Sequence, residues 1–453
     1  MQRERLGSRL GFILLSVGCA IGIGNVWKFP YIVGQNGGGI FVLIYIFFLA
    51  IIGVPVLTME FSLGRAAQKS PLKLYQELEP KGSKWHIHGY FCLIGSYLLM
   101  MFYTTVTAWM IMYFVKMARG DFSGADTGAV KKIFSEVQGK PLPIILFVGI
   151  VVFLGFGVCA IGVQKGLERI TKVMMLVLMS IMIILAVNSI MLEGGSEGLK
   201  FYLMPDFQKM KQIGVGEVIV QAMNQAFFTL SLGLGSMAIL GSYIGKERSL
   251  LGEAVNVAVL DTFVAFVSGL IIFPACLAYG VQPDSGPGLI FITLPNIFNH
   301  IAGGRFWGSL FFIFMSFAAL STVFAVFENI VSCVIDLTGW SRKKSCLVNG
   351  ITMFVLSLPC ILGFNLWSGF QPVGKGSSVM DLEDFLVSNL LLPLGSLTFI
   401  LFCVCRYGWG WKNFMTEANS GKGLKIQNWM RGYMTFVLPI VTAVIFIIGI
   451  VGR

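Results

Sequence analysis

The hydrophobic residues of this chain gather in long continuous runs that short polar segments separate. Many of these runs are roughly 20 to 30 residues long, enough for a helix to cross a hydrocarbon core about 30 Å thick. They lack the strict alternation of apolar and polar residues that marks a transmembrane β-strand. The pattern predicts an all-α polytopic membrane protein with eleven spans, at approximately 9–30, 39–64, 87–117, 142–162, 166–192, 215–243, 251–280, 304–336, 345–363, 384–405 and 433–452.

The composition excludes several classes of protein. Of the 453 residues, 56% are hydrophobic and only 12% are charged, whereas soluble proteins carry about 25% charged residues. A soluble multidomain enzyme and a disordered scaffold are therefore excluded. The nine cysteines form no C-x-x-C pair, and His86, His88 and His300 lie far apart in the sequence, so no metal site built from thiolates and imidazoles is expected. No pairing of a nucleophile with a base stands out either, so the chain is not expected to be an enzyme.

The basic residues indicate how the chain lies in the membrane. The net charge is +11, but the basic residues form no single patch, so a nucleic-acid partner is not expected. The larger group of lysines and arginines falls within 3–9, 65–84, 165–172, 246–248, 342–344 and 406–431. The positive-inside rule places this side, and with it the N-terminus, in the cytoplasm, and eleven spans place Arg453 outside. The first apolar run continues into the motifs described next, so a cleavable signal peptide is not expected.

Two of the runs are interrupted at their middle by small and polar residues. The first contains GCAIGIGN at 18–25 and the sixth contains TLSLGLG at 229–235. Each glycine costs a helix about 1 kcal/mol relative to alanine. For either run alone, close helix packing through small residues is an alternative interpretation. Each run, however, opens a set of five, which favours two inverted repeats at 9–192 and 215–405, followed by an extra helix at 433–452.

Broken helices of this kind expose backbone amides and carbonyls at the middle of the membrane. Exposed amides attract an anion, and exposed carbonyls attract a cation. Such backbone is tolerated inside a membrane only where it lines a cavity. The interruptions therefore favour a carboxylate-bearing solute bound beside a hard cation. No βαβ unit surrounds the G-x-G sequences, so dinucleotide binding is not expected.

Motifs distributed over nearly the whole chain point to one family. They are SRLGFILLSVGCAIGIGNVWKFPYIVGQNGGGIF, GVPVLTMEFSLGR, QAFFTLSLGLGS, FITLPNIF, FAALST and DLEDF. With them the chain resembles the neurotransmitter:sodium symporters, and in particular their bacterial amino-acid transporters. The resemblance implies a sodium-coupled symporter that imports an amino acid by alternating access in a bacterial cytoplasmic membrane. The alternative is an amino-acid sensor on the same fold with little transport. The resemblance leaves the oligomeric state open.

The resemblance implies two sodium sites made of oxygen ligands, which suit a hard cation. The first site would use the Ala20 and Thr229 carbonyls, the Asn25 side chain, the Thr229 hydroxyl, Asp261 and the substrate carboxylate. The second would use the carbonyls of Gly18, Ile21 and Ala318 with the hydroxyls of Ser321 and Thr322. These two hydroxyls have an alternative role, because each can instead bond back to its own helix.

The same resemblance places the substrate between the two broken helices. Its carboxylate would meet the Ile23 and Gly24 amides and the Tyr103 hydroxyl, near Gly22 and Thr322. Its ammonium would meet the Ala20, Phe228 and Thr229 carbonyls and the Ser231 hydroxyl. The side-chain pocket would be lined by Leu99, Val106, Phe228, Leu234 and Val326. A buried charge without a partner is costly, so this pocket predicts an apolar aliphatic or aromatic substrate.

The resemblance also implies ionic gates, and exposed ion pairs are weak enough to break in every cycle. Inside, Arg3 would pair with Asp336, with Tyr243 and residues 341–342 nearby. Outside, Lys28 would pair with Asp384. Glu60 lies within the second span and is expected to brace the broken sixth one.

Several positions depart from the family's pattern. Lys28 stands where an arginine is usual, Leu6 where a tryptophan is expected, and Leu176 where relatives have a proline. Leu234 occupies a position that is often aromatic. Asp261 replaces the asparagine of chloride-dependent relatives, and Ala265 replaces their chloride-binding serine. A fixed negative charge at Asp261 predicts transport that does not depend on chloride.

Overall fold

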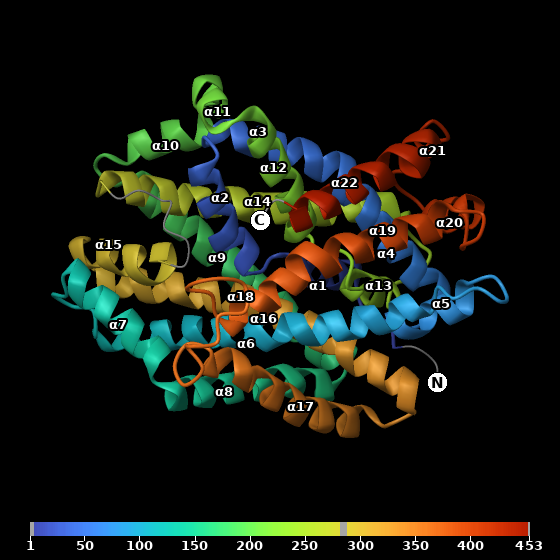
Figure 1. Cartoon of the computed structure of the whole chain (residues 1–453), viewed down its shortest axis with the longest axis horizontal. Helices are drawn as coiled ribbons and strands as arrows, with labels where there is room; N and C mark the ends of the chain where they lie inside the picture. Colours follow the sequence, from blue (N-terminus) through green and yellow to red (C-terminus); the bar gives the residue numbers. More distant parts are fainter. Residues whose placement is uncertain (1–3, 281–287, 452–453) are drawn as a thin grey trace.

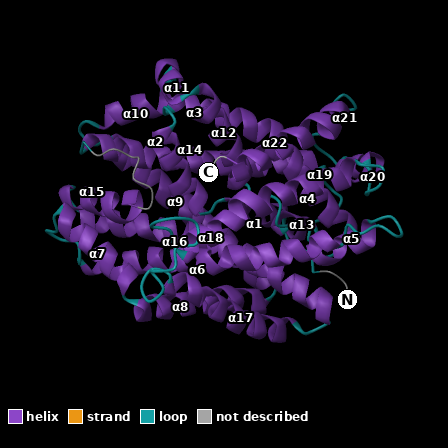
Figure 2. Cartoon of the chain, in the orientation of Figure 1, coloured by secondary structure: helices purple, strands orange, loops and turns teal. Residues whose placement is uncertain are grey.

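The computed structural model describes residues 4–280 and 288–451, and these ranges contain helices but no named strand (Figures 1 and 2). In its first part the helices are α1 (Arg9–Ala20), η1 (Gly24–Lys28), α2 (Phe29–Gln35), α3 (Gly39–Phe48), η2 (Leu49–Gly53), α4 (Val54–Ala67), α5 (Pro71–Leu78), α6 (Ile87–Arg119), α7 (Thr127–Gly139), α8 (Pro141–Ile161), η3 (Val163–Glu168), α9 (Arg169–Ile190), α10 (Gly195–Leu203) and α11 (Phe207–Ile213). They continue with α12 (Val215–Thr229), α13 (Ser236–Gly241), α14 (Leu250–Ala278), η4 (Leu289–Thr293), α15 (Leu294–His300), α16 (Gly304–Thr338), α17 (Arg342–Leu362), α18 (Val379–Phe385), η5 (Leu386–Leu391), α19 (Leu392–Val404), α20 (Trp411–Ala418), α21 (Met430–Gly432), η6 (Tyr433–Val437) and α22 (Leu438–Val451).

Within the described ranges, nine continuous helical stretches are long and apolar enough to cross a membrane. A tenth candidate is the pair Arg9–Ala20 and Gly24–Gln35, which is bent by 57° at a short break. These match ten of the expected spans. The expected sixth span is divided into α12 and α13, and neither half is long enough to count by itself. The all-α polytopic fold is therefore confirmed, and the total of eleven spans stays a prediction.

Wide helical turns recur at fixed places along the spans. The structure has π-helical segments labelled η1 to η6 in its described part, and five of them end two residues before a proline. These prolines are Pro30, Pro55, Pro295, Pro393 and Pro439. A proline lacks the amide hydrogen and its ring collides with the carbonyl four residues earlier, and a widened turn relieves both problems. The prolines thus bend the spans without ending them.

The segment η3 has no such proline. It follows Gly162, whose φ is +110°, and α9 then runs unbroken past Leu176 to Ile190. The wide turn of this span therefore lies at its beginning.

The broken helices lie in the middle of the bundle. Helix α16 is the most enclosed of the candidate spans, with 83% of its most apolar window buried, and it packs along α6. Helix α1 packs against α16, α9 and α14, while α13 packs against α4 and α1. Since the two breaks are enclosed by other spans, their unpaired backbone groups are kept away from lipid.

The polar connections lie at the two ends of the bundle. In Figure 1, α7 and α15 lie at the left end, whereas α5 and α20 lie at the right end. The segments that carry α5 and α20 belong to the group rich in lysine and arginine, and α7 does not.

Candidate functional site

The break in the first span is a short extended segment. Ile21 has φ −70° and ψ 93°, outside the helical region, and the helix resumes at Gly24 as η1. There is no room for side chains here. A Cβ added at Gly22 would collide with the Tyr103 hydroxyl, and one added at Gly24 would lie 2.6 Å from the Phe228 ring. The glycines therefore let Tyr103 and Phe228 approach the backbone at the break.

The break in the sixth span runs from Leu230 to Gly235. Ser231 is in the left-handed region with φ +50°, and so are Gly233 and Gly235 with φ +97° and +75°. The carboxylate of Glu60, a fully buried residue of α4, accepts a hydrogen bond of 2.6 Å from the Gly233 amide. This contact satisfies an amide that the helix cannot satisfy, and it joins Glu60 to the sixth span as expected.

The residues expected at the first sodium site lie together. Asn25 Nδ2 donates to Asp261 Oδ1 at 2.8 Å, and the Thr229 hydroxyl donates to Asp261 Oδ2 at 2.8 Å. All three residues are almost fully buried. In the part of the chain that the structure describes, Asn25 Oδ1 is buried with no hydrogen-bond partner. An unused carbonyl oxygen beside a buried carboxylate suits a hard cation.

All five residues expected at the second sodium site also converge. The Ser321 hydroxyl lies 3.4 Å from the Ile21 carbonyl and 2.8 Å from the Ala318 carbonyl. The Thr322 hydroxyl lies 3.3 Å from the carbonyls of Gly18 and Ile21. The contact with Ala318 is the back-bonding alternative for Ser321, and both hydroxyls reach the backbone of the first span. The resulting cluster of oxygen atoms fits a sodium ion.

Tyr103 links α6 to the break of the first span. Its hydroxyl accepts a hydrogen bond of 3.0 Å from the Ile23 amide, one of the two amides expected to bind a carboxylate. Ser231 Oγ lies 3.4 Å from the Cys19 carbonyl, so it joins the two breaks. The Tyr103 hydroxyl and the Ile23 amide, both expected to bind a carboxylate, therefore lie next to each other.

The residues expected around the substrate side chain are apolar and enclosed. The Leu234 side chain packs against Gly95 on α6, so closely that a Cβ added to this glycine would collide with it. Phe228 is half-buried and lines a larger cavity that opens beyond it. The others are buried, with exposed fractions of 7% for Leu99, 4% for Val106 and 0% for Val326.

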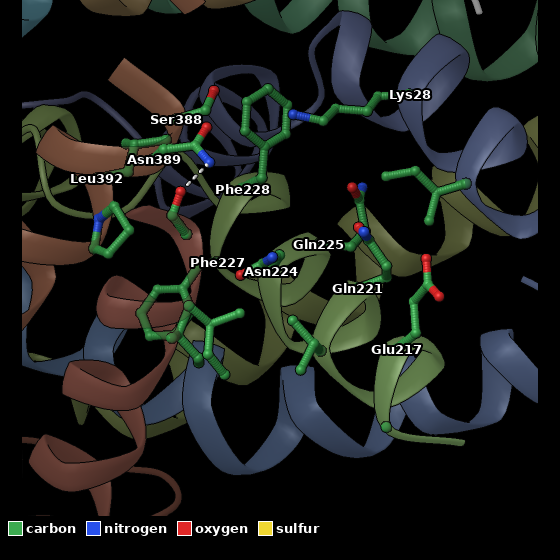
Figure 3. A pocket seen from close by; sticks show the side chains of 17 residues that line it. Lys28, Glu217, Gln221, Asn224, Gln225, Phe227, Phe228, Ser388, Asn389 and Leu392 are labelled. Atoms are coloured by element: carbon green, nitrogen blue, oxygen red, sulfur yellow. Dashed lines mark hydrogen bonds between the residues drawn. The ribbon is translucent and has the colours of Figure 1, made fainter. Parts of the chain in front are cut away.

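The predicted outer ion pair is wrong for this structure. Lys28 Nζ lies over the Phe228 ring, 3.8 Å from its centroid (Figure 3). Asp384 instead accepts a hydrogen bond of 2.7 Å from Ser388, and no ion pair joins it to Lys28 among the described residues. Lysine has a single compact charge and cannot make the bidentate contact of an arginine. A cation over an aromatic face is a favourable alternative.

Beyond Phe228 lies a cavity of about 540 Å³ (Figure 3). It is bounded by α12, by η5 with the start of α19, and by α22. Glu217, Gln221 and Gln225 lie along α12 on one side of it, and Lys28 and Phe228 lie on another. The side chain of Gln225 is 1% exposed, and neither its oxygen nor its nitrogen has a partner in the described ranges.

Buried charged groups lie near the residues expected at the inner gate. Arg3 lies outside the described residues, so its pairing with Asp336 stays a prediction, and Asp336 accepts a hydrogen bond of 2.7 Å from the Ser70 amide. Tyr243 donates at 2.6 Å to Glu328, a fully buried carboxylate of α16, which also pairs with Arg342 at 2.7 Å. Glu328 was not among the residues expected from the sequence, although a carboxylate inside an apolar span is a functional-site signal in itself.

The N-terminal segment is held by hydrogen bonds and an ion pair that were not expected from the sequence. The carboxylate of Glu168 in η3 accepts hydrogen bonds of 2.7 Å from the Gly7 amide and from the Ser8 hydroxyl. Arg9 pairs with the buried Glu253 at 2.9 Å. These contacts fix the start of α1 even though Leu6 replaces the expected tryptophan.

Comparison with known proteins agrees with this geometry. The sequence profile of the Sodium:neurotransmitter symporter family matches residues 3–126 and 134–453. The chain belongs to this family. The uncharacterized sodium-dependent transporter YhdH of Bacillus subtilis is 34% identical over 449 residues, which cover 98% of each chain. The sodium-dependent serotonin transporter of Drosophila melanogaster is 27% identical over 99% of this chain and 77% of its own.

A solved structure has the same architecture over nearly the whole chain. The crystal structure of MhsT in complex with L-phenylalanine matches with a TM-score of 0.87 and 35% sequence identity, over 98% of this chain and 99% of MhsT. As a family member the chain is a multi-pass membrane transporter of a sodium-dependent kind, and it is not an enzyme.

Proposed function

We propose that this protein is a symporter that couples the import of an apolar amino acid to sodium in a bacterial cytoplasmic membrane, with the N-terminus inside and the C-terminus outside. The observation that carries this proposal is the pair of oxygen clusters at the two breaks. Asn25, Thr229 and Asp261 make one cluster, and Ser321 and Thr322 with the first-span carbonyls make the other. The two clusters use residues from the two sides of the break in the first span, and together they suit two sodium ions.

The substrate class follows from the groups that surround the break. The Ile23 amide and the Tyr103 hydroxyl suit a carboxylate, while the buried Leu99, Val106, Leu234 and Val326 offer no charge to a substrate side chain. The complex of the related MhsT with L-phenylalanine, an apolar amino acid, supports this class.

The transport cycle in this proposal is one of alternating access, in which the site opens to one side of the membrane and then to the other. Ligands that bind one state better than the other shift the populations of the two states. Phe228 and Lys28 would cover the site on the outside, and Tyr243, Glu328 and Arg342 would close it on the inside.

The fixed charge of Asp261 makes chloride unnecessary in this proposal. Asp261 can balance the sodium ion of the first site, and Ala265, four residues later in α14, has no hydroxyl to bind an anion.

Uptake by purified protein in proteoliposomes tests the proposal. We expect saturable uptake of labelled leucine or phenylalanine that requires an inward sodium gradient, and exchange of substrate in counterflow. Binding without exchange would identify a sensor on the same fold. Uptake that proceeds equally well in potassium would overturn the sodium coupling.

A further inference from the structure

The tenth span begins with three carboxylates, of which only one faces the protein interior. Asp381 and Asp384 are partly exposed, whereas Glu383 is 3% exposed. The two outer carboxylates have clear partners. Asp381 accepts hydrogen bonds of 2.7 Å from the Ser378 amide and hydroxyl, and Asp384 accepts one of 2.7 Å from the Ser388 hydroxyl. Glu383 requires a different explanation.

Neither oxygen of Glu383 has a hydrogen-bond partner in the part of the chain that the structure describes. Helix α18, which carries it, packs against α6 and α17. The Cys360 thiol of α17 lies beside both Glu383 and the Thr105 hydroxyl of α6. That hydroxyl is also buried without a partner among the described residues. Three polar groups from three helices thus meet in an apolar interior without a complete hydrogen-bond network.

The surroundings disfavour a negative charge on Glu383. No lysine or arginine is paired with it in the described ranges. The charged or titratable groups around it are Cys360 on α17 and Asp381 and Asp384 on its own helix, while α6 contributes the uncharged Thr105. An isolated buried carboxylate costs so much that it is neutralised instead.

A proton suits the site better than a metal ion does. A hard metal cation takes about six oxygen ligands, whereas this site offers one carboxylate and one hydroxyl. The described residues contain no group of three metal-binding side chains. A protonated carboxyl gains a donor that can reach a hydroxyl or thiol acceptor, so the three groups can then satisfy one another.

Glu383 lies beside a residue expected at the outer gate, so a proton bound to its carboxyl group lies at the outer end of the transporter. The next residue is Asp384, and α18 continues into the wide turn of η5. Wide turns of this kind occur often at functional sites. If α18 moves away from α6 and α17 about this turn, water reaches Glu383 and the carboxyl can ionise.

We propose that Glu383 is a proton-binding site, occupied while α18 is packed against α6 and α17 and released when α18 moves away, so that proton occupancy and the opening of the outer side are linked. The link to opening rests on the proposed transport function, whereas the occupied site itself does not. By reciprocity, pH then biases the outer side between its closed and open states.

Infrared spectroscopy of the purified protein tests the occupied site without any transport. At neutral pH, the spectrum of the wild type minus that of Glu383→Gln should contain the C=O stretching band of a protonated carboxylic acid. The exposed Glu197→Gln is the matched control, and its difference spectrum should contain carboxylate bands only. Carboxylate bands in the Glu383 difference spectrum would overturn the proposal. Cys360→Ser should shift the band, because a hydroxyl is a stronger partner than a thiol, and an unshifted band would contradict the placement of the proton.

Transport assays test the link to opening. Glutamine mimics the protonated acid, so Glu383→Gln should keep sodium-driven uptake at acidic pH and should lose the pH dependence that the wild type shows between mildly acidic and mildly alkaline buffers. Identical pH profiles for the two proteins would overturn the link, even if the infrared band is present. If neither protein transports amino acids, the proposed function fails while the infrared result still decides the proton site.

Discussion

Asn25 donates a hydrogen bond of 2.8 Å to Asp261 and so joins the break of the first span to the middle of α14. The two residues are separated by 236 positions in the sequence. The contact leaves the other Asn25 side-chain atom, the carbonyl oxygen, buried without a partner among the described residues. A carboxylate and an unused carbonyl oxygen therefore lie together in one buried place, and both are ligands that suit a hard cation.

Transport by the wild type should not depend on chloride. Replacing chloride with gluconate should leave sodium-driven uptake in proteoliposomes unchanged, because Asp261 supplies the negative charge that balances the ion. The double variant Asp261→Asn with Ala265→Ser removes this charge and adds a hydroxyl, and its uptake should require chloride. A wild type that stops without chloride would show that Asp261 does not have this role.

Sodium dependence should require the two hydroxyls of the second cluster. Replacing Ser321 and Thr322 with alanine removes the only side-chain ligands assigned there, each of which contacts the Ile21 carbonyl. Interactions of this kind contribute on the order of 1–3 kcal/mol each, so uptake should fall at least about tenfold. Thr398→Ala, which removes an exposed hydroxyl from α19, serves as the control. Near-normal uptake at low sodium in the double variant would refute the assignment.

Substrate choice should depend on how much room Leu234 leaves for the substrate side chain in the pocket. Leucine, methionine and aromatic amino acids should compete well for uptake, and glutamate and lysine poorly. Leu234 already fills the space above Gly95, so Leu234→Phe has to extend toward the substrate and should shift the preference toward smaller side chains. Competition by unlabelled amino acids measures this shift. The pocket assignment fails if an acidic or basic amino acid is the best competitor.

The N-terminal segment should loosen when Glu168 is changed. Glu168→Ala removes the acceptor of both the Gly7 amide and the Ser8 hydroxyl, at a cost on the order of 1–3 kcal/mol. Hydrogen–deuterium exchange should then become faster in residues 4–9 and in η3, with little change in α16. Glu193→Ala, at an exposed position, should leave exchange unchanged. Equal protection of the N-terminal segment in the two variants would show that Glu168 does not hold it.

The sequence was sufficient for ten of the spans and for the two interruptions. Run length decides whether a helix can cross the membrane, and small residues at 18–25 and 229–235 weaken helices wherever they occur. Family motifs also identified which residues gather at the breaks, such as Asn25 with Asp261. These features depend on local composition or on sequence motifs that are typical of the fold.

The pairing of charged groups was decided by the tertiary structure. Lys28 was expected to meet Asp384, but it lies over Phe228, because an ion pair depends on the side-chain reach and spacing of helices that are distant in the sequence. Leu6 replaces the tryptophan that was expected to hold the N-terminal segment, and Glu168, a residue some 160 positions away, holds this segment instead. Glu328 and Glu383 are both carboxylates in apolar spans, yet one has Arg342 beside it and the other has no cation among the described residues. Periodicity places each of them on a helix, and only the packing of neighbouring helices determines whether a buried charge finds a partner or a proton.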